Sequence, residues 1–486
     1  MEPERALRRA AAGGGRAAPV NGHTSPATDV EAALYEVRRK IHPRAVHGWF
    51  AGWRWALVWA TQLVFYGLPW LAWNGRPAVL FDLGARKFYL LGMVLWPQDF
   101  IYLTVLLVIS ALSLFLFTAV AGRLWCGYAC PQTVYTEIFM WVERVIEGGS
   151  TARLRLDRAP WGARKLALKG VKHGAWLAAA LWTGFTFVGY FTPIRTLAQE
   201  LQTFSLGPWE TFWCLFYGFA TYGNAGFMRE QVCKYMCPYA RFQSAMFDAD
   251  TLVITYDAGR GEPRGSRRRS ADHKAAGLGD CVDCGICVQV CPTGIDIRSG
   301  LQYECIGCAA CVDACDQVMD RMGYPRGLIR YSTESAVKRG PSARPIVQRL
   351  LRPRVLIYAG ALAAITGALL ATLYLRVPLK VNVIRDRAAL MRETADGRIE
   401  NVYRLQVMNT VELPRRYRVS VSGLAGLELV ARQPLEIPAA ATVTVPVSLR
   451  IDPARIVPGS HPVVFRIEDL DSPDVAVREP SRFYAK

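Results

Sequence analysis

Apolar residues in this 486-residue chain gather into runs long enough to cross a lipid bilayer. A transmembrane helix needs roughly 20 mainly apolar residues. Five segments meet this requirement, at about 55–73, 101–121, 174–192, 209–227 and 355–375. The pattern predicts a helical membrane bundle of five spans. The fourth segment contains Glu210 and Asn224, so a buried or interfacial helix is the alternative there.

Basic residues are distributed unequally between the loops that join these segments. The loop between the second and third segments holds nine Arg and Lys residues between Arg123 and Lys172, whereas the next loop holds only Arg195. Cytoplasmic loops of membrane proteins carry an excess of Arg and Lys. We therefore expect the N-terminus and the region between the fourth and fifth segments to be cytoplasmic, and the residues after Leu375 to lie outside.

The residues after Leu375 alternate apolar and polar positions with a period of two, which is typical of strands. Gly and Pro separate these stretches, and no helical pattern interrupts them. Several short strands over roughly 110 residues predict an antiparallel sandwich of immunoglobulin type. The alternating stretches are 403–408, 417–422, 442–449 and 462–467.

Eight cysteines follow the fourth apolar segment in two sets, each spaced C-x2-C-x2-C-x3-C. Two-cluster bacterial ferredoxins use this spacing, in which the fourth cysteine of each set ligates the other [4Fe-4S] cluster. The spacing predicts one cluster held by Cys281, Cys284, Cys287 and Cys315, and a second held by Cys305, Cys308, Cys311 and Cys291. Zinc sites and structural disulfides are the alternatives.

A second pair of cysteine motifs follows the second and fourth apolar segments. Both read C-x-Y-x-C-P, and they supply the thiols of Cys126, Cys130, Cys233 and Cys237. Thiols spaced i, i+4 face the same side if the segment is helical, and thiolates favour copper(I). The repeat predicts a redox or copper site, with buried small residues as the alternative. Cys214 stands alone, and packing is the simpler interpretation for it.

Charge and histidine content disfavour two classes of function, nucleic-acid binding and membrane haem binding. The net charge of +18 is spread over loops beside apolar segments, where orientation and anionic lipid already account for it, so nucleic-acid binding is disfavoured. Only six histidines occur, and they offer no pair suited to clamp a membrane haem. The first 40 residues lack the continuous apolar stretch of a secretory signal, which predicts a flexible tail.

Further sequence strings resemble the CcoG/FixG/RdxA family of cytochrome c oxidase accessory proteins. They are Phe81–Lys87, Leu95–Phe100, Met228–Phe242 and Tyr324–Tyr331. The resemblance implies a bacterial inner-membrane protein that reduces copper(II) and supplies copper(I) for assembly of cbb3-type cytochrome oxidase. The implied partners are membrane lipid, a cytoplasmic electron donor, a copper chaperone or exporter, and the oxidase assembly machinery. An electron relay to quinone and a non-enzymatic assembly scaffold are the alternatives.

The expected fold is therefore a five-span α-helical membrane bundle with an inserted ferredoxin-like domain and a C-terminal all-β immunoglobulin-like sandwich. Its parts are a flexible cytoplasmic tail (1–50), a four-span membrane core with both C-x3-C-P motifs (51–250), a cytoplasmic ferredoxin-like domain (251–353), a fifth transmembrane helix (354–376) and a periplasmic immunoglobulin-like domain (377–486).

Overall fold

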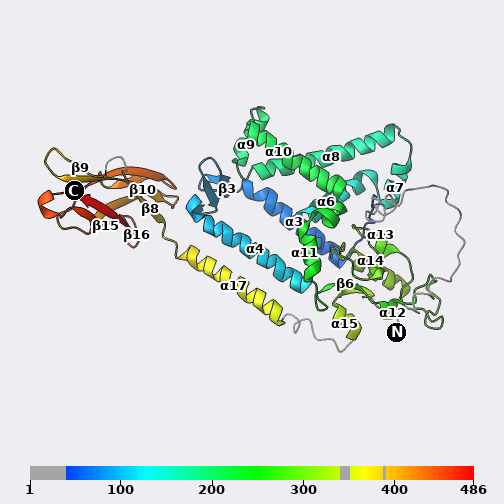
Figure 1. Cartoon of the computed structure of the whole chain (residues 1–486). Helices are drawn as coiled ribbons and strands as arrows, with labels where there is room; N and C mark the ends of the chain where they lie inside the picture. The colour runs from blue at the N-terminus through cyan, green and yellow to red at the C-terminus, as the bar shows by residue number, and fades with distance from the viewer. Residues whose placement is uncertain (1–39, 340–350, 387–389, 486) are drawn as a thin grey trace, which may run out of the picture. The chain divides into compact units, whose positions relative to one another are not determined.

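The computed structural model describes residues 40–339, 351–386 and 390–485 (Figure 1). Most of the predicted N-terminal tail, residues 1–39, lies outside these ranges.

A long helix occupies each of the five predicted apolar segments. These helices are α3 (Trp49–Gly67), α4 (Phe100–Ala121), α8 (Ala163–Val188), α10 (Pro208–Thr221) and α17 (Pro353–Tyr374). Among the described residues, two helical stretches are long and apolar enough to cross a membrane, Pro97–Ala121 and Pro353–Tyr374. Almost none of their surface is buried by the rest of the protein, as expected of lipid-facing helices. The count of five spans stays a prediction.

Two of the other helices, α8 and α10, have features that are unusual for a simple membrane span. Helix α8 carries Lys165, Lys169 and Lys172 in its first three turns, and α10 gives way after 14 residues to a π-helical segment, η3 (Tyr222–Met228). A second π-helical segment, η4 (Val232–Met236), precedes α11 (Pro238–Met246). Such segments occur frequently at functional sites.

A small antiparallel sheet that the sequence analysis missed lies between α3 and α4. It consists of β3 (Val79–Asp82), β4 (Lys87–Leu90) and β5 (Met93–Leu95), beside a two-stranded ribbon of β1 (Ala72–Trp73) and β2 (Arg76–Pro77). After this sheet, the buried carboxylate of Asp99 accepts a hydrogen bond from the Trp96 amide at 3.0 Å and pairs with Arg376 at 2.7 Å. Asp99 therefore caps the 3-10 turn Pro97–Asp99 that leads into α4 and ties this turn to the chain just after α17.

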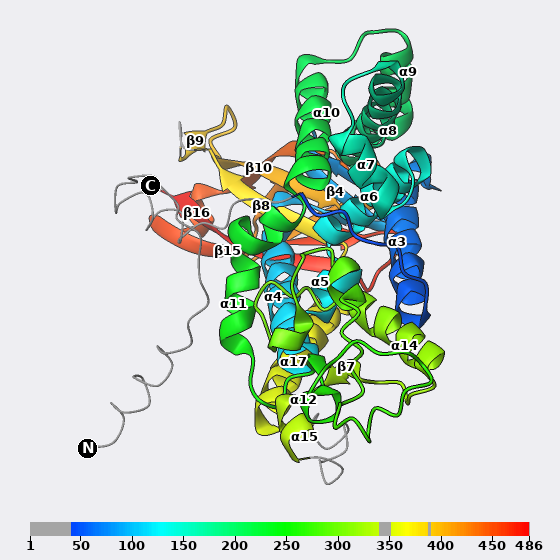
Figure 2. The ribbon, with the colours of Figure 1, turned by 90° about the vertical axis from the view of Figure 1, so that its right-hand side faces the viewer.

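The cysteine-rich region forms a small domain on one antiparallel strand pair. Strand β6 (Val253–Tyr256) pairs with β7 (Ile329–Ser332), and both pack on α14 (Ala310–Met322) through Ile254, Ile329 and Met319. Helix α14 lies against the first turns of α3 (Figures 1 and 2). The remaining short helices are α12 (Ala258–Gly261), α13 (Ile286–Gln289) and α15 (Glu334–Arg339).

The C-terminal region is a sandwich of two antiparallel sheets. One sheet has the order β12-β14-β10-β8, with β9 beside β10, and the other has the order β13-β11-β15-β16. Inward-facing residues of both sheets, among them Tyr403, Leu405 and Phe465, form its core. The strands are β8 (Leu379–Arg385), β9 (Arg392–Glu393), β10 (Ile399–Asn409), β11 (Arg415–Ser422), β12 (Glu428–Val430), β13 (Leu435–Ile437), β14 (Thr442–Ile451), β15 (Gly459–Asp469) and β16 (Ala476–Ala485).

Candidate electron-transfer site

Four thiols from separate parts of the chain line one cavity in the cysteine-rich domain. Three of them come from residues 281–287, a loop that runs into the first turn of α13, and Cys315 reaches the cavity from the second turn of α14. The loop turns tightly because Asp283 and Gly285 adopt left-handed backbone conformations, with φ of 49° and 63°. The cavity is lined by the set that the spacing predicts, Cys281, Cys284, Cys287 and Cys315.

A second cavity beside the first is lined by the other predicted set, Cys291, Cys305, Cys308 and Cys311, together with Cys287. Left-handed Gly307 and Ala309 shape the loop that carries Cys308, and α14 then begins at Ala310. Cys311 and Cys315 lie one turn apart on α14, yet they line different cavities. The structure therefore brings together the crossed sets that the sequence predicts.

The donor chemistry of both cavities fits [4Fe-4S] clusters, since each presents at least the four cysteine sulfurs that a cluster needs. Burial raises the pKa of Cys287 to about 11 and the pKa values of Cys305 and Cys315 to about 12. These thiols are neutral without a cluster, so cluster binding releases protons. All 13 cysteines are free thiols.

The first C-x3-C-P motif lies directly on the loop of the second cysteine set. Cys126 belongs to the short helix α5 (Leu124–Tyr128), where a Cβ atom on Gly127 would lie 2.8 Å from the Cα and N atoms of Cys308. In return, a Cβ atom on Gly307 would lie 3.1 Å from the Arg123 carbonyl oxygen. The two backbones touch because both positions are glycines.

The second C-x3-C-P motif reaches the same place. Cys233 in η4 and Cys126 both pack against the buried residues around Cys308, namely Val290, Ile306 and Ala310. Burial, reinforced by the neighbouring motif thiols, raises the pKa of Cys126 to about 11 and that of Cys233 to about 12. The structure thus gathers both motifs beside the second cysteine set.

The condition for the paired thiols to share one face, a helical segment, is not met throughout either motif. Cys130 and Cys237 lie outside helices, in extended conformation, and Pro131 and Pro238 then begin α6 (Pro131–Glu147) and α11. A residue before proline avoids the α conformation, whereas proline itself suits the first position of a helix. Within the described residues, no group of three or more His, Cys, Asp or Glu side chains is placed to hold a single metal ion.

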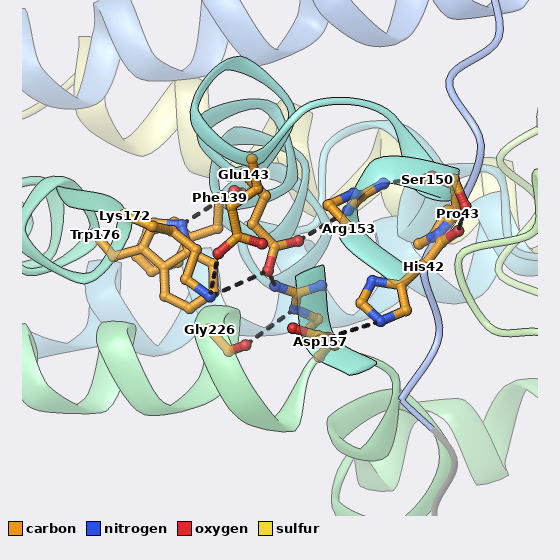
Figure 3. A network of polar contacts seen from close by, with 12 residues as sticks. His42, Pro43, Phe139, Glu143, Ser150, Arg153, Asp157, Lys172, Trp176 and Gly226 are labelled. Atoms are coloured by element: carbon orange, nitrogen blue, oxygen red, sulfur yellow. Dashed lines mark hydrogen bonds and ion pairs between the residues drawn. The ribbon is translucent and has the colours of Figure 1, made fainter. Parts of the chain in front are cut away.

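A network of buried charges surrounds Glu143 (Figure 3). Glu143 of α6 is fully buried and pairs with Arg153 at 2.9 Å and with Arg229 at 2.8 Å. Arg229 lies four residues before Cys233, and its carbonyl oxygen accepts a hydrogen bond at 3.1 Å from Gln132, which directly follows the first motif. The network therefore links the segments beside the two motifs through α6.

Lysines of α8 complete this network. Lys172 pairs with the buried Glu147 at 3.1 Å and lies over the Trp176 ring (Figure 3). Although burial acts in the opposite direction, Arg229, Arg153 and Lys172 together hold the pKa of Glu143 below its ordinary value. From the sequence, these basic residues indicated only which side of the membrane the loops face. The signal that could have indicated the buried network is the pair of acidic residues at 143 and 147, one helical turn apart.

Cys214 lies apart from both sites. It is half-buried in α10 and packs with Phe185, Ile194 and Leu197. This placement agrees with a packing role.

Comparison with known protein families gives three matches along the chain. A 4Fe-4S binding domain matches residues 103–148, a 4Fe-4S dicluster domain matches residues 228–334, and the IG-like fold at the C-terminal of FixG matches residues 369–486. Protein RdxA of Cereibacter sphaeroides is 41% identical over 449 residues, which cover 90% of this chain and 93% of RdxA. The chain belongs to the FixG/RdxA family.

A second relative agrees with this assignment. The nitrogen fixation protein FixG of Rhizobium meliloti is 40% identical over 436 residues, covering 83% of each chain. A solved FixG-related protein from Vibrio parahaemolyticus is 28% identical over 22% of this chain and 97% of its own, with a TM-score of 0.21. The predicted family is confirmed, and so are its iron–sulfur character and its immunoglobulin-like C-terminal domain.

Proposed function

We propose that this FixG/RdxA protein is a cupric reductase, which converts copper(II) to copper(I) at the C-x3-C-P thiols for assembly of cbb3-type cytochrome oxidase. The observation that carries the proposal is the backbone contact between Gly127 and the Cys308 loop. It puts Cys126 at the surface of the second cysteine set. When bound, the [4Fe-4S] clusters supply one-electron transfer, and each copper(II) needs one electron.

The thiols suit copper as a substrate because soft sulfur ligands stabilise copper(I) over copper(II). Cys126, Cys130, Cys233 and Cys237 are all half-buried, so they are partly reachable from solvent. They do not form a closed site for a single ion in the described residues. A loose arrangement favours passing copper(I) on, because a preformed thiolate cage would hold it tightly.

The proposed topology places this chemistry at the cytoplasmic face of the bacterial inner membrane. It comprises five spans, with the ferredoxin-like domain inside and the immunoglobulin-like domain in the periplasm. The density of Arg and Lys between residues 123 and 172 supports this orientation. A cytoplasmic carrier would then donate electrons, and a copper chaperone or exporter would take copper(I) toward the oxidase assembly machinery.

An anaerobic copper-reduction assay tests the proposal. The full-length protein is purified in detergent, its iron and sulfide are measured, and it is reduced with dithionite. After removal of excess dithionite, it is mixed with copper(II) and a chromophore specific for copper(I). We expect the Cys126→Ser/Cys233→Ser double variant to lose at least ten-fold in rate while keeping its iron. Cys214→Ser is the matched control and should reduce copper at the wild-type rate.

Two outcomes would contradict the proposal. One is an unchanged rate in the double variant with its iron retained, which would favour an assembly scaffold. The other is oxidation of the reduced protein by a soluble quinone but not by copper(II), which would favour a relay to quinone.

A further inference from the structure

Two buried arginines flank the second cysteine set. Arg54 is 9% exposed and Arg123 is 4% exposed. Arg54 lies on the buried face of α3 with Ala51 and Val58, and this face is fixed to α14 because the Ala51 amide donates to the Asp313 carboxylate at 2.7 Å.

Each guanidinium is close to that set. Arg54 lines the same cavity as Cys308 and Cys233. Arg123 immediately precedes α5, and its carbonyl oxygen lies against Gly307 in the Cys308 loop. Its positive charge also acts on the thiols of Cys305 and Cys126. Both charges therefore lie close to the second set and to a C-x3-C-P thiol.

Neither charge is neutralised by an ion pair within the described part of the chain. The Nε atoms of Arg54 and Arg123 have no hydrogen-bond partner there, and Arg123 donates otherwise to the Ala240 carbonyl oxygen. Two carboxylates, Glu137 and Asp313, are in electrostatic range of Arg54 but do not pair with it. Buried charges are normally paired, so two unpaired cations at one site call for an anionic group.

The first cysteine set has more acidic surroundings. The cation that lines its cavity, Arg298, is paired with Asp296 at 2.7 Å and with Asp283 at 2.5 Å. A further carboxylate, Asp316, acts electrostatically on Cys315. The fixed charge around the first set is therefore negative on balance. Around the second set the two arginines offset the nearby carboxylates, Glu137 and Asp313, so the fixed charge there is less negative.

Reduction adds one negative charge to a cluster, and buried charges act strongly on such a change. We propose that Arg54 and Arg123 raise the reduction potential at the second cysteine set above that at the first. One electron then moves from the first site, which is oxidised, to the second site, which is reduced, in the direction of Cys126 and Cys233. That this direction of electron flow is useful rests on the proposed function. The order of the two potentials does not depend on copper.

A redox titration of the full-length protein tests the order of potentials without copper. The anaerobically purified protein is titrated with dithionite and mediators, and the two cluster signals are followed by electron paramagnetic resonance. We expect Arg54→Gln to lower the reduction potential of the higher-potential signal by about 59 mV or more. This corresponds to a change of at least tenfold in the one-electron reduction equilibrium. The reduction potential of the other signal should change by only a small fraction of that shift.

Matched variants separate charge from packing. Arg54→Lys keeps the charge and should restore most of the wild-type potential, and Arg123→Gln should repeat the effect of Arg54→Gln. Arg326→Gln removes an exposed cation paired with Asp320 in the same domain and should shift neither signal. If Arg54→Gln loses its iron, Arg123→Gln and Arg54→Lys carry the test.

Three results would overturn the inference. They are unchanged potentials in both glutamine variants, a shift confined to the lower-potential signal, and an equal shift in the lysine and glutamine variants. Failure of copper reduction would refute the proposed function but leave this order of potentials standing.

Discussion

Replacing Gly127 by alanine tests the contact on which the proposed electron path depends. The added Cβ would lie 2.8 Å from the Cα and N atoms of Cys308 and 2.8 Å from the Ile306 carbonyl oxygen. All three are backbone atoms, so no flexible side chain can move aside. Favourable contacts between carbon atoms begin at about 3.5 Å. Helix α5 and the Cys308 loop must therefore separate by about 0.7 Å.

The cost of this separation follows from two opposing effects. Overpacking a tight contact destabilises a protein by about 1–3 kcal/mol. Alanine regains roughly 1 kcal/mol over glycine inside a helix. The net loss for Gly127→Ala is therefore up to about 2 kcal/mol, together with slower copper reduction because the Cys126 thiol moves away from the second cysteine set.

Thermal denaturation in detergent and the anaerobic copper-reduction assay measure these two effects. Gly170→Ala is the matched control, because Gly170 lies in helix α8 and a Cβ there would meet nothing within 4 Å. The control should denature at the wild-type temperature or slightly above it and reduce copper normally. If Gly127→Ala matches the control in both measurements, the close contact does not position the thiols.

Three further changes probe the surroundings of the site in the full-length protein. Glu143→Gln should cost about 3–5 kcal/mol, because Arg153 and Arg229 lose their buried partner, and the denaturation temperature should fall accordingly. Since the folded state lowers the pKa of Glu143, its contribution to stability is present above pH 4.5 and is lost as the pH falls further, which denaturation at different pH values will show. Asp313→Ala removes the acceptor for the first amides of α3 and should cost about 1 kcal/mol by the same measurement. Phe465→Ala should cost about 3–5 kcal/mol in the core of the sandwich and make that domain sensitive to protease.

The sequence predicted the features that depend on short-range spacing. The crossed cysteine sets follow from loops of two residues and one helical turn, so the structure brings together Cys315 with the 281–287 loop as expected. The strands of the sandwich follow from strict alternation, and β10 indeed buries every second residue over most of its length.

Features that depend on contacts between residues far apart in the chain could not be predicted from the sequence. The ion pair between Glu143 and Arg229 joins residues 86 positions apart in sequence, and nothing local to either residue indicates the other. The strands β3 to β5 have three or four residues each, too few to establish a period. The i, i+4 spacing of Cys126 and Cys130 left the helix as a condition, and Cys130 is extended because the proline that follows it disfavours the α conformation at the residue before it.

Two independent contacts fix the second cysteine set relative to the C-x3-C-P thiols. The Asp313 carboxylate binds the first amides of α3, and the Cys308 loop touches α5 through glycine backbones. Residues 262–281, by contrast, form a long connection without helix or strand. Because both contacts are made by α14 and the loop just before it, the distance between the second set and the thiols does not depend on that connection. The proposed electron transfer to the thiols thus needs no movement of the ferredoxin-like domain, which distinguishes this arrangement from a carrier that must swing on its linker.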